Sequence, residues 1–196
     1  SCTAPTNEKD YSVFVNPFIG TGGHGHTFPG AVVPHGMIQP SPDTRIDGWD
    51  ACSGYYYEDS TINGFSHTHV SGTGCCDYGD VLLMPTVGEQ RYQTTDPQSQ
   101  QLAYSSAFSH ENETAEPGYY SVFLDTYQVK AEISATKRSA IHRYTFPESS
   151  EAGFILDLDY SLQRQTNSDM GIEVISDTEI CGHKKTTYWA FDQYIN

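Results

Sequence analysis

Tyr119-Tyr120-Ser121-Val122-Phe123-Leu124 and Tyr127-Gln128-Val129-Lys130-Ala131-Glu132-Ile133 are the two segments that decide the predicted fold. Successive side chains of a strand point to opposite faces of the sheet. In the second segment Tyr127, Val129, Ala131 and Ile133 therefore share one face, and polar residues occupy the other. This period of two predicts two neighbouring β-strands that each bury one face.

The same alternation continues toward the C-terminus, in residues 140–146, 153–160, 170–175 and 186–191, with turn residues between these segments. No segment favours a helix longer than about two turns. Several short strands at such spacing are typical of an all-β sandwich or barrel.

The organisation of the chain is simple. Residues 1–10 are polar and are expected to form a flexible lead-in, and residues 11–196 are long enough for one all-β domain. Residues 89–118 are polar and are interpreted as a long connection or hairpin region, with Pro117-Gly118 as a turn. The last residues, 189–196, look like a strand without a closing signal. We expect a larger natural protein, in which the sandwich has further strands beyond this point.

Composition excludes two classes of partner. The chain carries 25 acidic and 10 basic residues, a net charge of −15, which repels nucleic-acid backbones. Its longest apolar runs, such as residues 81–84, are too short to span a bilayer. Such a composition fits an exported protein that handles neutral ligands.

The cysteines are five in number, Cys2, Cys52, Cys75, Cys76 and Cys181, and no C-x-x-C motif occurs. This favours buried free thiols over a disulfide framework. The opening Ser1-Cys2 is similar to a bacterial lipoprotein after its leader has been removed. A lipid on Cys2 and a boundary that falls there by chance both remain open.

A glycine-rich segment runs from Asn16 to Ala31 and holds five glycines together with His24 and His26. Glycine permits positive φ and close approach of the backbone to a ligand. The segment lacks the Gly-Lys-Ser/Thr ending of a phosphate-binding loop and the context of a dinucleotide site. It is suited to a neutral polar ligand such as a sugar, or to a turn that packs against a neighbouring domain.

A second polar segment runs from Asn63 to Asp80 and contains His67 and His69, which point the same way on a strand. With Cys75, Cys76, Asp77 and Asp80 behind them, these histidines raise the hypothesis of a zinc site. The alternative is a pair of histidines that hydrogen-bond neighbouring backbone, because zinc-type cysteine spacing is missing.

Trp49 lies in a polar, glycine-bearing segment and has two possible roles, as a platform for the apolar face of a sugar ring or as a core residue. Glycoside hydrolysis requires two carboxylates placed across the scissile bond. The sequence singles out no pair among its candidates, which are Asp47, Asp50, Asp77, Asp80, Asp157 and Asp159.

Two groups of strings carry a family resemblance. Residues 15–22, 24–31, 34–37 and 39–43 resemble the opening signature of glycoside hydrolase family 92, and residues 64–69, 71–75, 77–80 and 84–85 resemble its second signature. The match is dense over residues 11–88 and loose beyond them.

The resemblance implies an all-β fold, an N-terminal antiparallel β-sandwich followed by a large (α/α)6 barrel that this chain lacks. It implies an exo-α-mannosidase, often α-1,2-specific, that is calcium-dependent and acts on N-glycans or mannan with inversion. In this family the general acid, the base carboxylates and the calcium ligands belong to the barrel. No catalytic residue and no metal or cofactor site is therefore expected in this chain, which alone is expected to be inactive.

The resemblance also implies that this sandwich closes one side of the mannose pocket. The matching loop positions are Gly22, Gly23, His24, Trp49, Cys75 and Asp77; Cys76 also matches in place, but the family pattern varies there, and we exclude it. The His-x-His pairs then become fold-organising residues. The implied partners are a mannose-containing glycan and the barrel domain, and the implied location is the periplasm or cell surface, with membrane contact only through a lipid on Cys2.

Two rival functions stay open. The first is a free-standing carbohydrate-binding β-sandwich module. The second is a zinc-binding domain that uses His67, His69 and Cys75.

Overall fold

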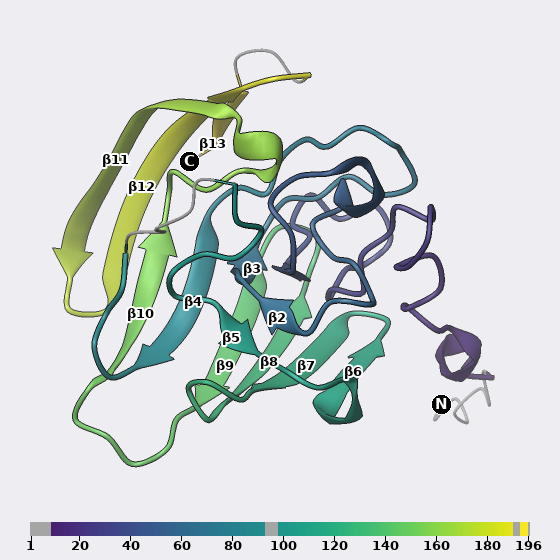
Figure 1. Cartoon of the computed structure of the whole chain (residues 1–196), viewed down its shortest axis with the longest axis horizontal. Helices are drawn as coiled ribbons and strands as arrows, with labels where there is room; N and C mark the ends of the chain where they lie inside the picture. The colour runs from purple at the N-terminus through teal and green to yellow at the C-terminus, as the bar shows by residue number, and fades with distance from the viewer. Residues whose placement is uncertain (1–8, 93–97, 190–192, 196) are drawn as a thin grey trace, which may run out of the picture.

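The computed structural model describes residues 9–92, 98–189 and 193–195, and within these ranges the fold is all-β (Figure 1). The strands are β1 (Ser41–Asp43), β2 (Thr61–Ile62), β3 (Gly64–Ser66), β4 (Leu82–Val87), β5 (Ser106–Ala107), β6 (Glu113–Glu116), β7 (Tyr119–Leu124), β8 (Val129–Ala135), β9 (Ala140–Thr145), β10 (Ala152–Asp157), β11 (Thr166–Ser176), β12 (Glu179–Thr187) and β13 (Gln193–Ile195). Four single turns of 3-10 helix join them: η1 (Ser12–Phe14), η2 (Trp49–Ala51), η3 (His110–Asn112) and η4 (Leu162–Arg164). None of the helices in these ranges is long and apolar enough to cross a membrane.

The antiparallel sheet β6-β7-β8-β9 is built from the alternating segments. Its strands pair in register, with Tyr120 opposite Ile133 and Val122 opposite Ala131. These four side chains are 0–1% exposed. Fully burying an aliphatic side chain of this size contributes roughly 1.5–3 kcal/mol. The alternation of residues 119–133 is therefore confirmed as the buried face of one layer.

The second layer is the sheet β1-β3-β4-β10, whose strands come from distant parts of the chain. It buries Phe65, Leu82 and Met84, and the ring of Phe65 lies 6.4 Å from the ring of Tyr120 in the first sheet. This contact closes the core between the two sheets. The expected all-β, antiparallel β-sandwich is confirmed.

Strand boundaries differ from the prediction where a side chain or a positive φ makes a turn. β8 begins at Val129 rather than Tyr127, because Gln128 has φ of 54°. β10 ends at Asp157 rather than residue 160, because its carboxylate accepts hydrogen bonds from the backbone N–H groups of Asp159 and Tyr160. The predicted connection at 89–118 contains β5, η3 and β6, and Pro117-Gly118 closes the β6–β7 hairpin; residues 93–97 lie outside the described ranges.

The third sheet, β11-β12-β13, stands at one side of the molecule, where β11 and β12 form a long hairpin (Figure 1). The strand predicted at 186–191 is wrong in position. β12 covers residues 179–187, and residues 190 and 191 lie outside the described part of the chain. The prediction failed because most of β12 is exposed and carries no alternating apolar face. The flexible lead-in proposed for residues 1–10 falls almost wholly outside the described residues, as does Cys2.

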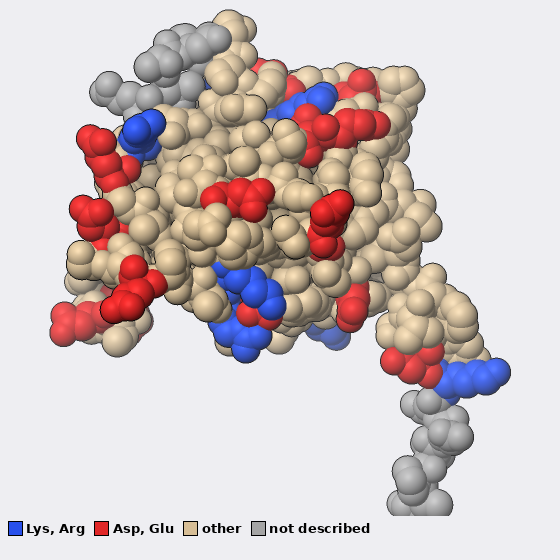
Figure 2. Space-filling view, turned by 60° about the horizontal axis from the view of Figure 1, so that its bottom comes forward, with Lys and Arg blue, Asp and Glu red and all other residues tan. Residues whose placement is uncertain are grey.

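Long connections gather beside the sheets, on the right of Figure 1, and one of them reaches the third sheet through Asp80. They comprise the glycine-rich loop around residues 20–27, the loop 44–54 that holds η2, and the loop 67–81 between β3 and β4. The sequence strings that resemble family signatures therefore fall mainly in these loops. Figure 2 shows acidic side chains scattered over one face of the molecule.

Candidate functional site

The glycine-rich loop folds back on itself through its own backbone. The N–H of Thr27 donates to the carbonyl of Gly20 over 3.2 Å, and its hydroxyl donates to the carbonyl of Ile19 over 3.0 Å. A side-chain carbon on Gly25 would overlap the backbone of Gly20. The loop is closed tightly because glycine stands at this crossing, as its composition predicted.

The Trp49 ring is the exposed centre of the site. Its side chain belongs to η2 and is 56% exposed. The rings of His26 and His24 lie 4.5 Å and 5.0 Å from it, and His24 Nδ1 contacts the carboxylate of Asp50. A side-chain carbon on Gly74 would overlap the indole nitrogen of Trp49. Two histidines and a glycine thus hold an aromatic ring with one part open to ligand.

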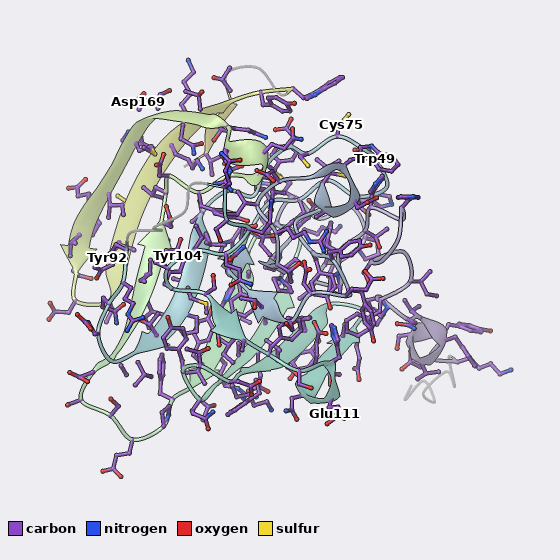
Figure 3. The ribbon with its side chains drawn as sticks, viewed as in Figure 1. Trp49, Cys75, Tyr92, Tyr104, Glu111 and Asp169 are labelled. Atoms are coloured by element: carbon purple, nitrogen blue, oxygen red, sulfur yellow. The ribbon has the colours of Figure 1, made fainter. Side chains whose placement is uncertain are left out.

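Three loops meet at this ring. The N–H of Gly72 donates to the carbonyl of His26 over 2.6 Å, and the thiol of Cys52 donates to the carbonyl of Thr73 over 2.7 Å. Figure 3 shows Trp49 and Cys75 at the same end of the molecule, far from Tyr92. Loops that are distant in sequence therefore build one surface, which we call the Trp49 wall and define by His24, His26, Trp49, Asp50, Gly74 and Cys75.

His26 is the feature of this wall that sequence analysis did not include among the site residues. It is 8% exposed, and its Nε2 has no hydrogen-bond partner among the described residues. Leaving a buried polar atom unpaired costs about 1–3 kcal/mol. Such an atom beside an exposed aromatic ring is suited to a hydroxyl of a ligand or to a water molecule. The His-x-His motif carried the signal, but the motif does not say which histidine is buried.

The other predicted site residues are placed as follows. Gly22 lies against Tyr57 and Glu58, Gly23 has φ of 56° and open space beside it, and Cys75 is exposed. Asp77 is 7% exposed and its carboxylate accepts a hydrogen bond from the backbone N–H of Tyr78. His24, Trp49 and Cys75 are thus brought to one surface, whereas Asp77 is buried.

The two histidines of the zinc hypothesis have other partners. His69 Nδ1 lies 2.7 Å from the carbonyl of Gln39, and its Nε2 lies 2.8 Å from the carboxylate of Asp43. His67 Nδ1 lies 2.7 Å from the carbonyl of Val81. In the described ranges no three His, Cys, Asp or Glu side chains are arranged to hold a metal ion. The zinc hypothesis built on His67, His69 and Cys75 therefore has no support, and both histidines organise the loops.

Buried carboxylates and their partners hold the base of these loops. Glu113 accepts hydrogen bonds from the hydroxyls of Tyr55 and Tyr120, at 3.0 Å and 2.6 Å. Burial, and the nearby charge of Glu113, raise the pKa of both tyrosines far above the ordinary value. Tyr55 is a core residue, whereas Tyr57 is exposed.

Several candidate catalytic carboxylates have structural partners. Asp47 pairs with Arg164 at 2.9 Å, Asp80 pairs with buried Lys184 at 2.9 Å, and Asp157 accepts a hydrogen bond from the hydroxyl of Tyr104. Each of these three carboxylates therefore has a role in holding the fold together.

Comparison with known proteins gives a consistent result. The Glycosyl hydrolase family 92 N-terminal domain matches residues 14–196. A solved family GH92 α-mannosidase of Bacteroides thetaiotaomicron, in complex with mannoimidazole, is 41% identical with a TM-score of 0.85; the alignment covers 93% of this chain and 24% of that chain. An inverting GH92 mannosidase of Bacteroides thetaiotaomicron VPI-5482 is 29% identical with a TM-score of 0.73, over 95% of this chain and 25% of that one.

A curated relative, an uncharacterized secreted glycosidase of Arthroderma benhamiae, is 31% identical over 76% of this chain and 19% of its own length. The chain thus spans about a quarter or less of these relatives. Because the family match covers nearly the whole sequence and the solved relatives share its fold, the chain belongs to glycoside hydrolase family 92, a family of glycosidases, as its N-terminal domain.

Proposed function

We propose that this domain forms one wall of the mannose pocket in a full-length family 92 α-mannosidase. The observation that carries the proposal is the pairing of the exposed Trp49 ring with the buried, unpartnered Nε2 of His26. The ring stacks on the apolar face of the sugar, and the nitrogen bonds one of its hydroxyls. Gly22, Gly23, His24 and Cys75 border this contact, and Asp77 supports it from below.

The chemical step belongs to the remainder of the full-length protein. Hydrolysis with inversion uses one carboxylic acid to protonate the leaving oxygen and one carboxylate to activate water, about 6.5–9.5 Å apart. Asp47, Asp80 and Asp157 are already engaged in ion pairs or hydrogen bonds. This domain contributes positioning of the substrate, and the 196-residue chain alone is inactive.

The substrate we propose is an α-1,2-linked mannoside of an N-glycan or of mannan. Two solved relatives are described as mannosidases, one of them inverting, which supports the sugar and the stereochemistry. Calcium is expected, from the family resemblance, to bind in the barrel domain. We assign no residue of this chain to it and derive no step through it.

The partner domain we propose is the family's (α/α)6 barrel. A groove of about 880 Å³ lies between the third sheet, β10 and the loop that leads into β4, lined by Leu156, Leu158, Ile172 and Ile180 among others. Ile172, Val174 and Ile180 are 50–73% exposed. Apolar surfaces gathered in this way are favoured sites of contact with other protein segments. Further parts of the full-length chain, including the barrel, are the occupants we propose.

We also propose export to the periplasm or cell surface, since a curated relative is described as secreted. Mass spectrometry of the natural protein tests a lipid on Cys2. An unmodified Cys2 would contradict the anchor while leaving export possible.

The proposed wall is tested by Trp49→Ala in the full-length protein, assayed on an α-1,2-linked mannobiose. Loss of the stacking surface should lower kcat/KM by about tenfold or more, which corresponds to about 1.4 kcal/mol. Tyr92→Ala is the matched control, because Tyr92 is 67% exposed and lies far from Trp49 (Figure 3). A Trp49→Ala enzyme with the kcat/KM of the control would reject the wall.

Two further measurements separate the rival functions. Calorimetric titration of the 196-residue chain with mannose should give no binding if the pocket needs both domains, and a measurable affinity would favour a free-standing carbohydrate-binding module. Near-stoichiometric zinc in the purified chain would revive the zinc-binding domain.

A further inference from the structure

Two buried thiols lie near each other beneath the Trp49 wall. Cys52 and Cys76 are 0% and 2% exposed, and each thiol influences the pKa of the other. The thiol of Cys52 also reaches the carbonyl of Thr73, whereas the thiol of Cys76 lies 3.6 Å from the carbonyl of Gly48. Each thiol therefore contacts the loop that carries the other one.

The surrounding backbone permits these sulfur atoms to move closer. A disulfide holds its sulfur atoms about 2.05 Å apart, which is closer than two separate thiols can lie. The two loops contain Gly48 and Gly72, which have φ of 112° and 78°, and no heavy atom lies within 4 Å of a side-chain carbon built on either. Glycines in open space can take up the small shift that a bond requires.

The third cysteine of this cluster is exposed. Cys75 stands next to Cys76 in the chain, and its thiol is exposed. Exposed thiols react with oxidants more readily than buried ones. Burial raises the pKa of Cys52 and of Cys76, so these two thiols react slowly by themselves.

We propose that Cys52 and Cys76 form a regulatory or stabilising disulfide that is closed by a disulfide oxidant, with Cys75 as the thiol that reacts first. The thiolate of Cys75 attacks the oxidant RS–SR, forms Cys75–S–SR and releases RS⁻. The thiolate of Cys52 attacks the sulfur of Cys75 and releases the second RS⁻. The thiolate of Cys76 then attacks the sulfur of Cys52 and releases Cys75. In total Cys52 and Cys76 lose two protons and two electrons, and the oxidant becomes two RSH.

The consequence of the bond is a fixed Trp49 wall. Cys52 directly follows η2, which carries Trp49, and Cys76 directly follows Cys75. A bond between them ties the loop of Trp49 to the loop of Gly74. The cross-link restricts the unfolded chain and raises the stability of this region. Because both sulfur atoms are buried, the bond is also protected from external thiols once it has formed.

The test uses the reduced full-length protein, incubated with oxidised glutathione at pH 8 and then blocked with N-ethylmaleimide in denaturant. Chymotrypsin cuts after the aromatic residues between Cys52 and Cys76, so a linked pair of peptides reveals a bond by mass spectrometry. Fragmentation between the adjacent Cys75 and Cys76 then shows which of the two is linked. We expect Cys52 linked to Cys76, Cys75 and Cys181 blocked, and a Tm higher by several degrees that dithiothreitol reverses. Blocked Cys52 and Cys76 after prolonged oxidation, or a lasting bond to Cys75, would overturn the proposal.

Two variants test the order of attack. Cys75→Ser should slow closure by at least tenfold and still yield the same linked peptides. Cys181→Ser, at an exposed cysteine on β12, is the matched control and should close at the wild-type rate. Closure of Cys75→Ser at the wild-type rate would remove Cys75 from the sequence of steps. The oxidation experiment on the unaltered protein needs no variant. It therefore tests the proposal even if one of the variants fails to fold.

Discussion

At the scale of single residues, His67 and His142 form a short chain of hydrogen bonds between the two sheets. His67 Nδ1–H donates to the carbonyl of Val81, so the Nε2 of neutral His67 accepts from His142 Nε2–H over 3.0 Å. His142 Nδ1 in turn accepts from the hydroxyl of Tyr144 over 2.8 Å. A proton added to His67 Nε2 would place its N–H group opposite the N–H group of His142. Each ring therefore holds its place only while it is neutral.

This arrangement predicts a loss of stability in mild acid. Burial and the neighbouring His67 lower the pKa of His142 to about 3, and burial also lowers the pKa of His67. Between pH 6.5 and about pH 3 the unfolded His142 binds a proton that the folded one refuses. Its stabilising contribution is therefore complete above pH 6.5 and falls by up to about 1.4 kcal/mol per pH unit below it.

The measurement is the Tm of the full-length protein between pH 7.5 and pH 5, in wild type and in His142→Gln. The wild type should lose more Tm over this interval than the variant, which cannot titrate at this position. His183→Gln, at an exposed histidine of β12, should keep the wild-type slope. Equal slopes in all three proteins would contradict the account of His142.

Sequence analysis at this scale succeeded only in part. It left Trp49 open between a sugar platform and a core residue, and the structure exposes it. The expectation of buried thiols is confirmed for Cys52 and Cys76 and is wrong for Cys75 and Cys181, which are exposed. The burial of His26 was not anticipated, because it depends on Gly72 and Trp49, which reach it from other loops. Contacts between distant loops leave no periodic signal in the sequence.

At the scale of elements, β12 is anchored by one buried ion pair. Lys184 Nζ lies 2.9 Å from the carboxylate of Asp80 and donates to the carbonyl of Tyr160 over 2.8 Å, and both charged side chains are 0–1% exposed. The hydroxyl of Thr186 donates to the same carboxylate. Since Asp80 lies in the loop that leads into β4, this pair joins the third sheet to the base of the site.

Lys184→Met should therefore detach β12. Removal of one partner leaves a buried, uncompensated charge and costs about 3–5 kcal/mol. In the full-length protein, amide hydrogen exchange over residues 179–187 should become more than about 100-fold faster. Lys130→Met, at an exposed lysine of β8, should leave this exchange unchanged.

A double variant, Asp80→Asn with Lys184→Met, separates charge from packing. It should recover part of the lost protection, because no unpaired charge remains. Unchanged exchange in Lys184→Met would contradict an anchoring role for the pair.

The elements divide clearly into predictable and unpredictable ones. β7, β8 and β9 were predicted to within two residues at each end, because residues that face the core alternate along each strand with residues that face away from it. β12 was misplaced, since its burial comes from single anchors such as Lys184 rather than from an apolar face. β1, β2 and β5 have two or three residues each, too short for any period to register.

At the scale of the whole molecule, the sandwich acts as a rigid support for loops. Family resemblance pointed to those loops as the candidate site, whereas periodicity identified only the sheets. Figure 1 shows the loops gathered on one side of the sandwich. Composition contributed the exclusion of nucleic acid as a partner, through a net charge of −15.

The most direct test of the central claim is a crystal structure of the full-length protein with mannoimidazole, the ligand bound by a solved relative. The account predicts that the inhibitor contacts the Trp49 ring and that His26 Nε2 hydrogen-bonds one of its hydroxyls. An inhibitor bound without contact to either residue, with the Trp49 ring covered by protein instead, would contradict it.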